Sequence, residues 1–136
     1  RTALAEGSGR MVLFYANRDQ EVLATWRSGI AAVAACPNVY MKLGGIGMPR
    51  TGFDWHTRDI PIGSEELAAS MAPLMTYCIE QFGPTRCMFE SNFPVDKASV
   101  SYPVLWNAFK KMTTSYTEAE KDAMFYGTAT KFYRLT

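Results

Sequence analysis

The sequence has few of the residues that usually hold metal ions or disulfide bonds, with one histidine and three cysteines among its 136 residues. Cys36, Cys78 and Cys87 are widely spaced and odd in number, which disfavours both a disulfide framework and a zinc cluster. We therefore expect buried thiols that pack as small hydrophobic side chains. The same cysteine usage favours the cytoplasm or another reducing compartment.

Long apolar runs and an excess of charge of one sign are also missing. No stretch approaches the ~20 apolar residues that cross a membrane, and 14 Lys+Arg are balanced by 13 Asp+Glu. A nucleic-acid partner would require a basic face, so we predict neither nucleic-acid binding nor a membrane span. Because 48% of the residues are hydrophobic, the chain can bury enough surface to fold. We expect one domain over residues 1–136, with an irregular N-terminal segment over residues 1–18.

Common catalytic and nucleotide-binding motifs are absent as well. The sequence contains no HxH, HExxH, CxxC, GxSxG or Walker-type glycine loop. The glycines of Gly44–Gly47 lack the spacing of a dinucleotide fingerprint. A serine or cysteine nucleophile would have only His56 as its base, and nothing in the sequence places the two together.

What the sequence does contain is apolar residues at helical spacing in four stretches. The predicted helices cover residues 17–36, 64–82, 101–112 and 117 to the C-terminus. Capping boxes at 17–20 and 117–120 mark the starts of the first and the last. The second is expected to have Ser64 as its N-cap, and to kink or restart near Ala72 because Pro73 lacks a hydrogen-bond donor.

Two short runs of β-branched and aromatic residues, Asn38–Leu43 and Arg86–Glu90, predict strands. A long loop over residues 46–63 follows the first, and loops of this length are usually functional or mobile. Strands that alternate with helices indicate β-α-β crossovers and a parallel sheet, so the expected fold class is α/β. Two strands cannot cover both faces of a sheet, so either Met11–Tyr15 adds a third strand or another chain completes the sheet.

Polar side chains gather where the two predicted strands end, and in parallel α/β folds the active site lies at the carboxyl ends of the strands. The candidates after the first strand are Lys42, His56 and Arg58, and those after the second are Glu90, Asn92 and Asp96. Carboxylates and a histidine that converge there could bind a divalent metal or serve as acid and base.

These candidates also have structural interpretations. His56 is consistent with a surface or packing residue, and Glu90 with a salt bridge to Arg86 or Lys97. Asn92 is consistent with a turn in which its side chain binds its own backbone ahead of the following proline.

At residues 38–45 and 86–94 the sequence resembles the amidohydrolase-related family, metal-dependent TIM-barrel hydrolases that include sugar lactonases, dicarboxylate lactonases and related decarboxylases. The resemblance extends from Trp26 to Leu135. It implies a partial (β/α)8 TIM barrel, consisting of the last βα units, the seventh and eighth strands, with the C-terminal helices. A complete barrel needs ~250 residues, so the chain would be the C-terminal part of one.

The resemblance also implies a site. The family's metal centre is built from an HxH at the first strand, histidines at later strands and an aspartate after the eighth. Here Asn92 stands in the aspartate's position, where its amide oxygen is a weak metal ligand and no general base. Asp96 is the nearest carboxylate that could substitute, and Glu90 is the third catalytic candidate. The implied cofactor is a divalent metal, zinc or manganese, which activates water for hydrolysis of a lactone or amide.

On the same resemblance, Lys42, His56 and Arg58 would bind an anionic carboxylate on a small-molecule substrate. This chain alone lacks the HxH and the inner histidines, so the centre would need an N-terminal barrel half or a partner chain. The alternative is a degenerate, non-catalytic half-barrel without a metal, which serves as a structural or interaction subunit. That alternative predicts a large apolar face covered by a partner or a homo-oligomer. A third, weaker hypothesis is a small-molecule-binding module that uses the loop over residues 53–59.

Overall fold

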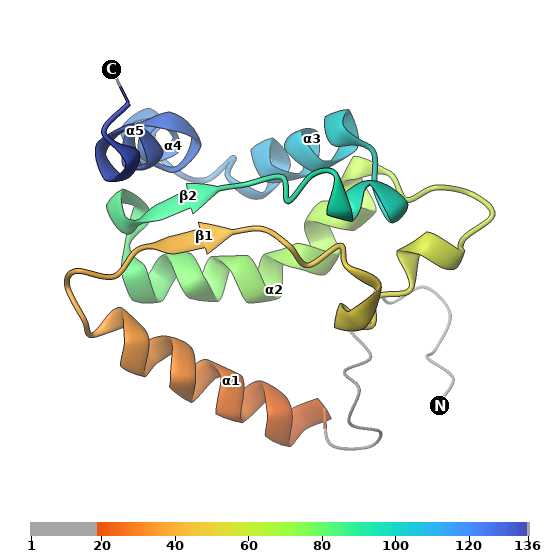
Figure 1. Ribbon diagram of the computed structural model, residues 1–136, viewed down its shortest axis with the longest axis horizontal. Coiled ribbons are helices and arrows are strands. Elements are labelled where there is room, and N and C mark those ends of the chain that lie inside the picture. Colours follow the sequence, from red (N-terminus) through yellow and green to blue (C-terminus); the bar gives the residue numbers. More distant parts are fainter. Residues whose placement is uncertain (1–18, 136) are drawn as a thin grey trace.

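Two short parallel strands lie side by side, and α2 runs along them (Figure 1). The computed structural model describes residues 19–135. The helices and strands in chain order are α1 Asp19–Ala34, β1 Met41–Leu43, α2 Ser64–Phe82, β2 Cys87–Phe89, α3 Tyr102–Met112, α4 Glu118–Asp122 and α5 Thr128–Tyr133. The described part is therefore mostly helical with a small parallel sheet, and the predicted helices over 64–82 and 101–112 are confirmed.

The sheet pairs β1 with β2 in parallel, as the alternation of elements predicted. Met41 lies opposite Cys87 and Leu43 opposite Phe89, and the Glu90 N–H donates to the Leu43 carbonyl at 3.1 Å. Both strands are shorter than predicted: Pro37 and Asn38 lie in a turn before β1, and the 3-10 turn Pro84–Arg86 includes the first residue predicted for the second strand. The predicted third strand at 11–15 and the capping box at 17–20 extend outside the described residues.

The long helix α2 provides much of the core. The apolar stripe predicted for this helix is buried except for Leu74, which is half-buried, and Ala68 is buried as well. The buried members of the stripe are Leu67, Met71, Met75, Cys78, Ile79 and Phe82. Two details differ from the sequence-based expectation. Gly63, not Ser64, is the N-cap, because Ser64 already has helical geometry and its side chain caps nothing. The helix also runs through Pro73 without a break, so a restart near Ala72 is wrong.

Aromatic rings join the C-terminal helices to the sheet. Phe89 of β2 stacks on Phe109 of α3, with ring centroids 4.5 Å apart. The ring of Phe89 also contacts that of Phe125, with centroids 4.8 Å apart. Phe125 belongs to a π-helical turn, Ala123–Gly127, that interrupts the single helix predicted after residue 117. A π turn inserts an extra residue and so rotates the faces that follow it.

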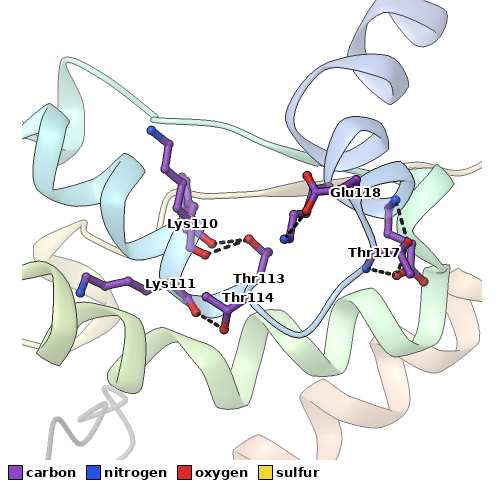
Figure 2. Close-up of polar contacts among 9 residues, drawn as sticks. Lys110, Lys111, Thr113, Thr114, Thr117 and Glu118 are labelled. Atoms are coloured by element: carbon purple, nitrogen blue, oxygen red, sulfur yellow. Dashed lines mark hydrogen bonds and ion pairs between the residues drawn. The ribbon is translucent and has the colours of Figure 1, made fainter.

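The connection between α3 and α4 is built from side chains that bond to the backbone (Figure 2). Thr113 Oγ1 donates to the Phe109 and Lys110 carbonyls, and Thr114 Oγ1 donates to the Lys111 carbonyl. The Phe109 and Lys110 carbonyls also accept the Thr113 N–H, so these bonds add to the pairing of carbonyls at the end of α3. The capping box predicted at Thr117 is confirmed, since Glu120 N–H donates to Thr117 Oγ1 and the Thr117 N–H to Glu120 Oε2.

The three cysteines form no disulfide. Cys78 and Cys87 are buried as predicted, and burial raises the pKa of their thiols to about 11 and about 12. Cys36 is exposed, which corrects the expectation, because it lies in the turn where the chain leaves α1. Among residues 19–135 no helix is both long and apolar enough to cross a membrane.

Candidate functional site at the strand ends

The carboxyl ends of β1 and β2 are neighbours because the strands are parallel. Leu43, Cys87 and Phe89 belong to the hydrophobic core, so these alternate positions face the helices. Lys42 and Glu90 occupy the intervening positions and therefore face the opposite side of the sheet. Lys42 and Glu90 are thus on the side of the sheet opposite these core residues.

Lys42 and Glu90 form an ion pair across the strand ends. The distance from Nζ to Oε2 is 2.7 Å, and the side chains are 50% and 29% exposed. The hydrogen bond that Lys42 donates to Glu90 raises the pKa of Lys42. Gly44 makes room for this arrangement, because a Cβ there would lie 2.4 Å from the Glu90 Cγ and 2.5 Å from its carbonyl oxygen. Glu90 therefore forms a salt bridge, as its structural interpretation predicted, but the partner is Lys42 and not Arg86 or Lys97.

Arg86 is engaged elsewhere. Its guanidinium donates to the Ala34 and Cys36 carbonyls at 2.9 Å each, and to the Phe82 carbonyl at 2.9 Å. These carbonyls lie at the ends of α1 and α2, where backbone acceptors lack partners within the helix. Arg86 thus ties the start of β2 to two helix ends, which explains why it does not pair with Glu90.

Asp96 links the loop after β1 to the loop after β2. Its side chain is buried, with 1% exposed. Oδ2 accepts the Gly47 N–H at 3.2 Å, and Oδ1 accepts the Asn92 Nδ2–H at 2.8 Å. Burial raises the pKa of Asp96, and these two hydrogen bonds oppose that shift. A Cβ on Gly47 would lie 2.9 Å from the Asp96 carboxyl carbon, so the contact requires glycine there.

The hydrogen bond to Asp96 holds the Asn92 side chain in a defined orientation. Its backbone has a φ of 52°, in the left-handed region that asparagine tolerates better than most residues. Its side chain donates to Asp96, not to its own backbone as the turn interpretation expected. The hydrogen bond uses the amide nitrogen, and the carbonyl oxygen of the same group is the atom that a metal or a substrate donor would require.

His56 and Arg58 lie in the loop after β1, in and beside the short 3-10 turn Trp55–Thr57. His56 is exposed, which is consistent with the surface interpretation. Arg58 binds both carboxylate oxygens of Glu66, at 2.9 and 2.6 Å, and is thereby fixed to the first turn of α2. The structure therefore brings Lys42, Glu90, Asn92 and Asp96 to the strand ends, while Arg58 is paired away from them. Their roles in binding and catalysis remain predictions.

Two contributors to this site were missed by the sequence-based prediction, namely the close-approach glycines Gly44 and Gly47. Each lets a residue of the second loop come within contact distance of the first loop. Their spacing after a predicted strand was the available indication, because glycine at such a position often marks close approach of another segment.

The described residues do not by themselves fit a metal ion. Residues 19–135 contain no group of three or more His, Cys, Asp or Glu side chains that could hold one. Both Asp96 oxygens already accept hydrogen bonds inside the protein, and Glu90 is paired with Lys42. The Asn92 amide oxygen remains available, and an amide beside paired carboxylates is too weak a ligand set for zinc or manganese.

Parallel strands joined by a helix define a mostly helical protein with a small parallel sheet, and charged and amide side chains gather at the carboxyl ends of its strands. The amidohydrolase family profile matches residues 12–135. The chain belongs to the amidohydrolase family.

Individual relatives agree with this assignment. The chain is 38% identical over 110 residues to the protein y4mH of Sinorhizobium fredii, covering 81% of this chain and 33% of that protein. It is 32% identical over 133 residues to the L-fucono-1,5-lactonase of Burkholderia multivorans, covering 94% of this chain and 41% of the lactonase. The chain thus spans only about a third to two-fifths of the length of these relatives.

Solved structures show the same relation. A crystal structure of an amidohydrolase from Burkholderia multivorans with bound HEPES superposes with a TM-score of 0.74 at 29% identity, covering 88% of this chain and 40% of that one. A crystal structure of an amidohydrolase from the same organism with bound zinc gives a TM-score of 0.72 at 28% identity, covering 86% and 39%. The resemblance inferred from residues 38–45 and 86–94 is therefore confirmed at the level of the family.

Proposed function

We propose that this chain forms the C-terminal part of a TIM-barrel hydrolase and supplies the seventh and eighth strands and their loops to its active site. The observation that carries this proposal is the polar cluster at the strand ends, where Lys42 pairs with Glu90 and Asp96 holds Asn92. In barrels with parallel strands, catalytic residues come from this end of the strands. The length of the relatives supports a barrel with further strands from outside the described residues.

The reaction that we propose is hydrolysis of a lactone or a related carbonyl compound. Water adds to the carbonyl carbon, and in a lactone the bond from that carbon to the ring oxygen breaks, so that the ring oxygen takes up a proton and a hydroxy acid is formed. Similarity to a protein named L-fucono-1,5-lactonase supports a lactone in preference to an amide. Lys42 is placed to stabilise negative charge on the substrate, either a carboxylate or the carbonyl oxygen. Glu90 can accept a proton from water, because its carboxylate is partly exposed beside Lys42.

Asn92 and Asp96 take different parts in this proposal. Asn92 would hydrogen-bond the substrate through its amide oxygen. Asp96 is buried with both oxygens engaged, so it would position Asn92 instead of meeting the substrate. A divalent metal, zinc or manganese, would supply activated water when bound, and a zinc-containing relative supports its presence in the whole enzyme. Its ligands would come from outside the described residues.

The test is hydrolysis of a panel of sugar lactones by the longest natural polypeptide that contains this sequence. Lys42→Met is expected to lower kcat/KM by about tenfold or more, because one charge-assisted contact is typically worth ~1.5–3 kcal/mol. The matched control is Lys131→Met, which removes an exposed lysine from α5. Equal activity of the two variants would contradict the assignment of Lys42.

A second candidate function, a non-catalytic interaction subunit, is favoured by one observation. Large apolar side chains are exposed near the C-terminus: Tyr126, Phe132, Tyr133 and Leu135. Clusters of this kind often mark protein contacts, either with an N-terminal barrel half, a partner chain or a second copy. Absence of lactone hydrolysis, together with a concentration-dependent native mass, would favour this function.

A further inference from the structure

Lys42 and Glu90 meet across the ends of the two strands, and Glu90 is the more firmly held of the two. The Lys42 side chain is 50% exposed, and its Nζ lies 2.7 Å from Oε2 of Glu90. The Glu90 main chain is fixed by the hydrogen bond from its N–H to the Leu43 carbonyl, and its Cγ lies in the space that Gly44 leaves open. The Glu90 carboxylate therefore stays near the strand ends, and any anion that binds Lys42 must lie close to it.

A second carboxylate lies near this ion pair. Both oxygens of Asp96 accept hydrogen bonds, one from the Gly47 N–H and one from the Asn92 amide, as an ionised carboxylate does. Burial is the main cause of the raised pKa of Asp96, and the negative charge of Glu90 contributes to it. The two carboxylates are thus within electrostatic reach of each other, and an anion bound to Lys42 would meet the repulsion of both.

Lactone hydrolysis, the proposed function on which this inference rests, changes the charge of the bound molecule. The lactone is neutral, and its carbonyl oxygen is an atom that Lys42 is placed to stabilise. That oxygen becomes one of the two carboxyl oxygens of the hydroxy acid. The acid releases its proton near neutral pH, because carboxylic acids ordinarily have pKa values of about 4. The product is therefore an anion held by the lysine that pairs with Glu90 in the free protein.

We propose that Glu90 expels this anionic product from the site by competing with its carboxylate for Lys42. Binding of the product places two carboxylates beside one ammonium group or separates Lys42 from Glu90, and both outcomes weaken it. A neutral lactone carbonyl can share the ammonium group with Glu90, because lysine has three donor hydrogens and a neutral oxygen is not repelled. The ion pair therefore lowers the affinity for the product, in proportion to the fraction of Lys42 that Glu90 occupies, and spares the substrate.

A purely structural role for the ion pair makes the opposite prediction. If Glu90 only held Lys42 in place, removal of its charge would loosen Lys42 and weaken the binding of every ligand. If Glu90 competes for Lys42, removal of its charge strengthens the binding of an anion and leaves that of a neutral ligand unchanged. The direction of the change in affinity for the product separates the two roles.

The test is isothermal titration calorimetry near neutral pH on the longest natural polypeptide that contains this sequence. Its two probes are made from the lactone that the wild type hydrolyses fastest: the hydroxy acid from alkaline opening and the neutral alditol from reduction. Glu90→Gln, which keeps the shape of the side chain, is expected to bind the acid about fivefold tighter than the wild type, since a partly exposed ion pair is typically worth up to about that factor. Its affinity for the alditol is expected to stay within about twofold of the wild-type value.

Two further variants complete the test. Glu118→Gln is the matched control, because it removes a carboxylate from the 2.9 Å ion pair with Lys121 on α4, and it is expected to leave both affinities within about twofold. Lys42→Met in the Glu90→Gln background is expected to abolish the gain in affinity for the acid.

The proposal is overturned if Glu90→Gln weakens or does not change the binding of the acid, or if it strengthens the binding of acid and alditol alike. It is also overturned if the gain survives Lys42→Met, because another cation would then hold the product. Hydrolysis by the wild type together with any of these results contradicts this inference alone. If the wild type hydrolyses no lactone, the proposed function fails and this inference fails with it, since no product is formed.

Discussion

Replacing Asp96 with alanine is expected to destabilise the protein by disconnecting the two loops at the strand ends. The side chain is 1% exposed and accepts hydrogen bonds from the Gly47 N–H and the Asn92 amide. Leaving the buried Gly47 donor unsatisfied costs ~1–3 kcal/mol, and losing the half-buried Asn92 bond costs ~0.5–1.5 kcal/mol. Relief of the buried charge, which raises the pKa of Asp96, offsets part of this sum. We therefore expect a net loss of about 2 kcal/mol.

Urea unfolding followed by tryptophan fluorescence measures this loss. The expected result is a lower midpoint with an unchanged slope, since the surface exposed on unfolding stays the same. Asp59→Ala is the matched control, because Asp59 is an exposed aspartate in the loop after β1. We expect it to change the free energy of unfolding by less than ~0.5 kcal/mol. A loss at Asp96 no larger than that at Asp59 would refute the link between the loops.

A double-mutant cycle separates this contact from other effects of the substitution. Gly47→Ala places a Cβ 2.9 Å from the Asp96 carboxyl group and is expected to cost ~1–3 kcal/mol through overpacking. In the Asp96→Ala background the clash with the carboxyl group is removed and only the contact with the Cβ at 3.2 Å stays, so the same change should cost at least ~0.5 kcal/mol less. Strict additivity of the two changes would show that Gly47 and Asp96 do not interact as described.

Three further predictions concern other parts of the chain. Iodoacetamide at pH 8 should alkylate the exposed Cys36 quickly, and the buried Cys78 and Cys87 only on unfolding. The pKa values of about 11 for Cys78 and about 12 for Cys87 leave almost no thiolate below pH 9, so fast labelling of all three cysteines would contradict their burial. Thr117→Ala should lower the stability by ~0.5–2 kcal/mol in thermal unfolding through loss of the capping box, with Ser115→Ala as the neutral control. Glu66→Gln should cost no more than ~1 kcal/mol, since Arg58 and Glu66 are exposed and water screens their attraction; a larger loss, insensitive to salt, would be inconsistent with this surface pair.

The sequence predicted the helices better than the strands because helical contacts are local. The apolar stripes of α2 and α3 repeat within a few residues, so their bounds follow from spacing alone. The strands are three residues each, and their ends depend on turns whose partners lie elsewhere in the chain. The π turn at Ala123–Gly127 leaves the apolar spacing nearly helical, which is why a single helix was expected there.

The sequence was sufficient to locate the candidate site, but not to predict which of its side chains pair with one another. The rule that parallel sheets carry their sites at the carboxyl ends of strands brought Lys42, Glu90, Asn92 and Asp96 together correctly. Their pairing depends on the register of two strands more than 40 residues apart, which local patterns do not encode. Glu90 was therefore assigned to the wrong partner, and Asp96, which contacts Gly47 from 49 residues away, was expected to be a reactive carboxylate.

The two glycines explain how a small sheet can hold so many polar groups at one end. Gly44 lets the Glu90 main chain and side chain lie against the end of β1, where its carboxylate meets Lys42. Gly47 lets Asp96 reach a backbone donor in the first loop while its other oxygen orients Asn92 in the second. A side chain at either position would push the loops apart and separate both pairs. The geometry of Lys42, Glu90 and Asn92 is therefore determined by contacts within residues 42–96, independently of the ligands that a metal would need from elsewhere.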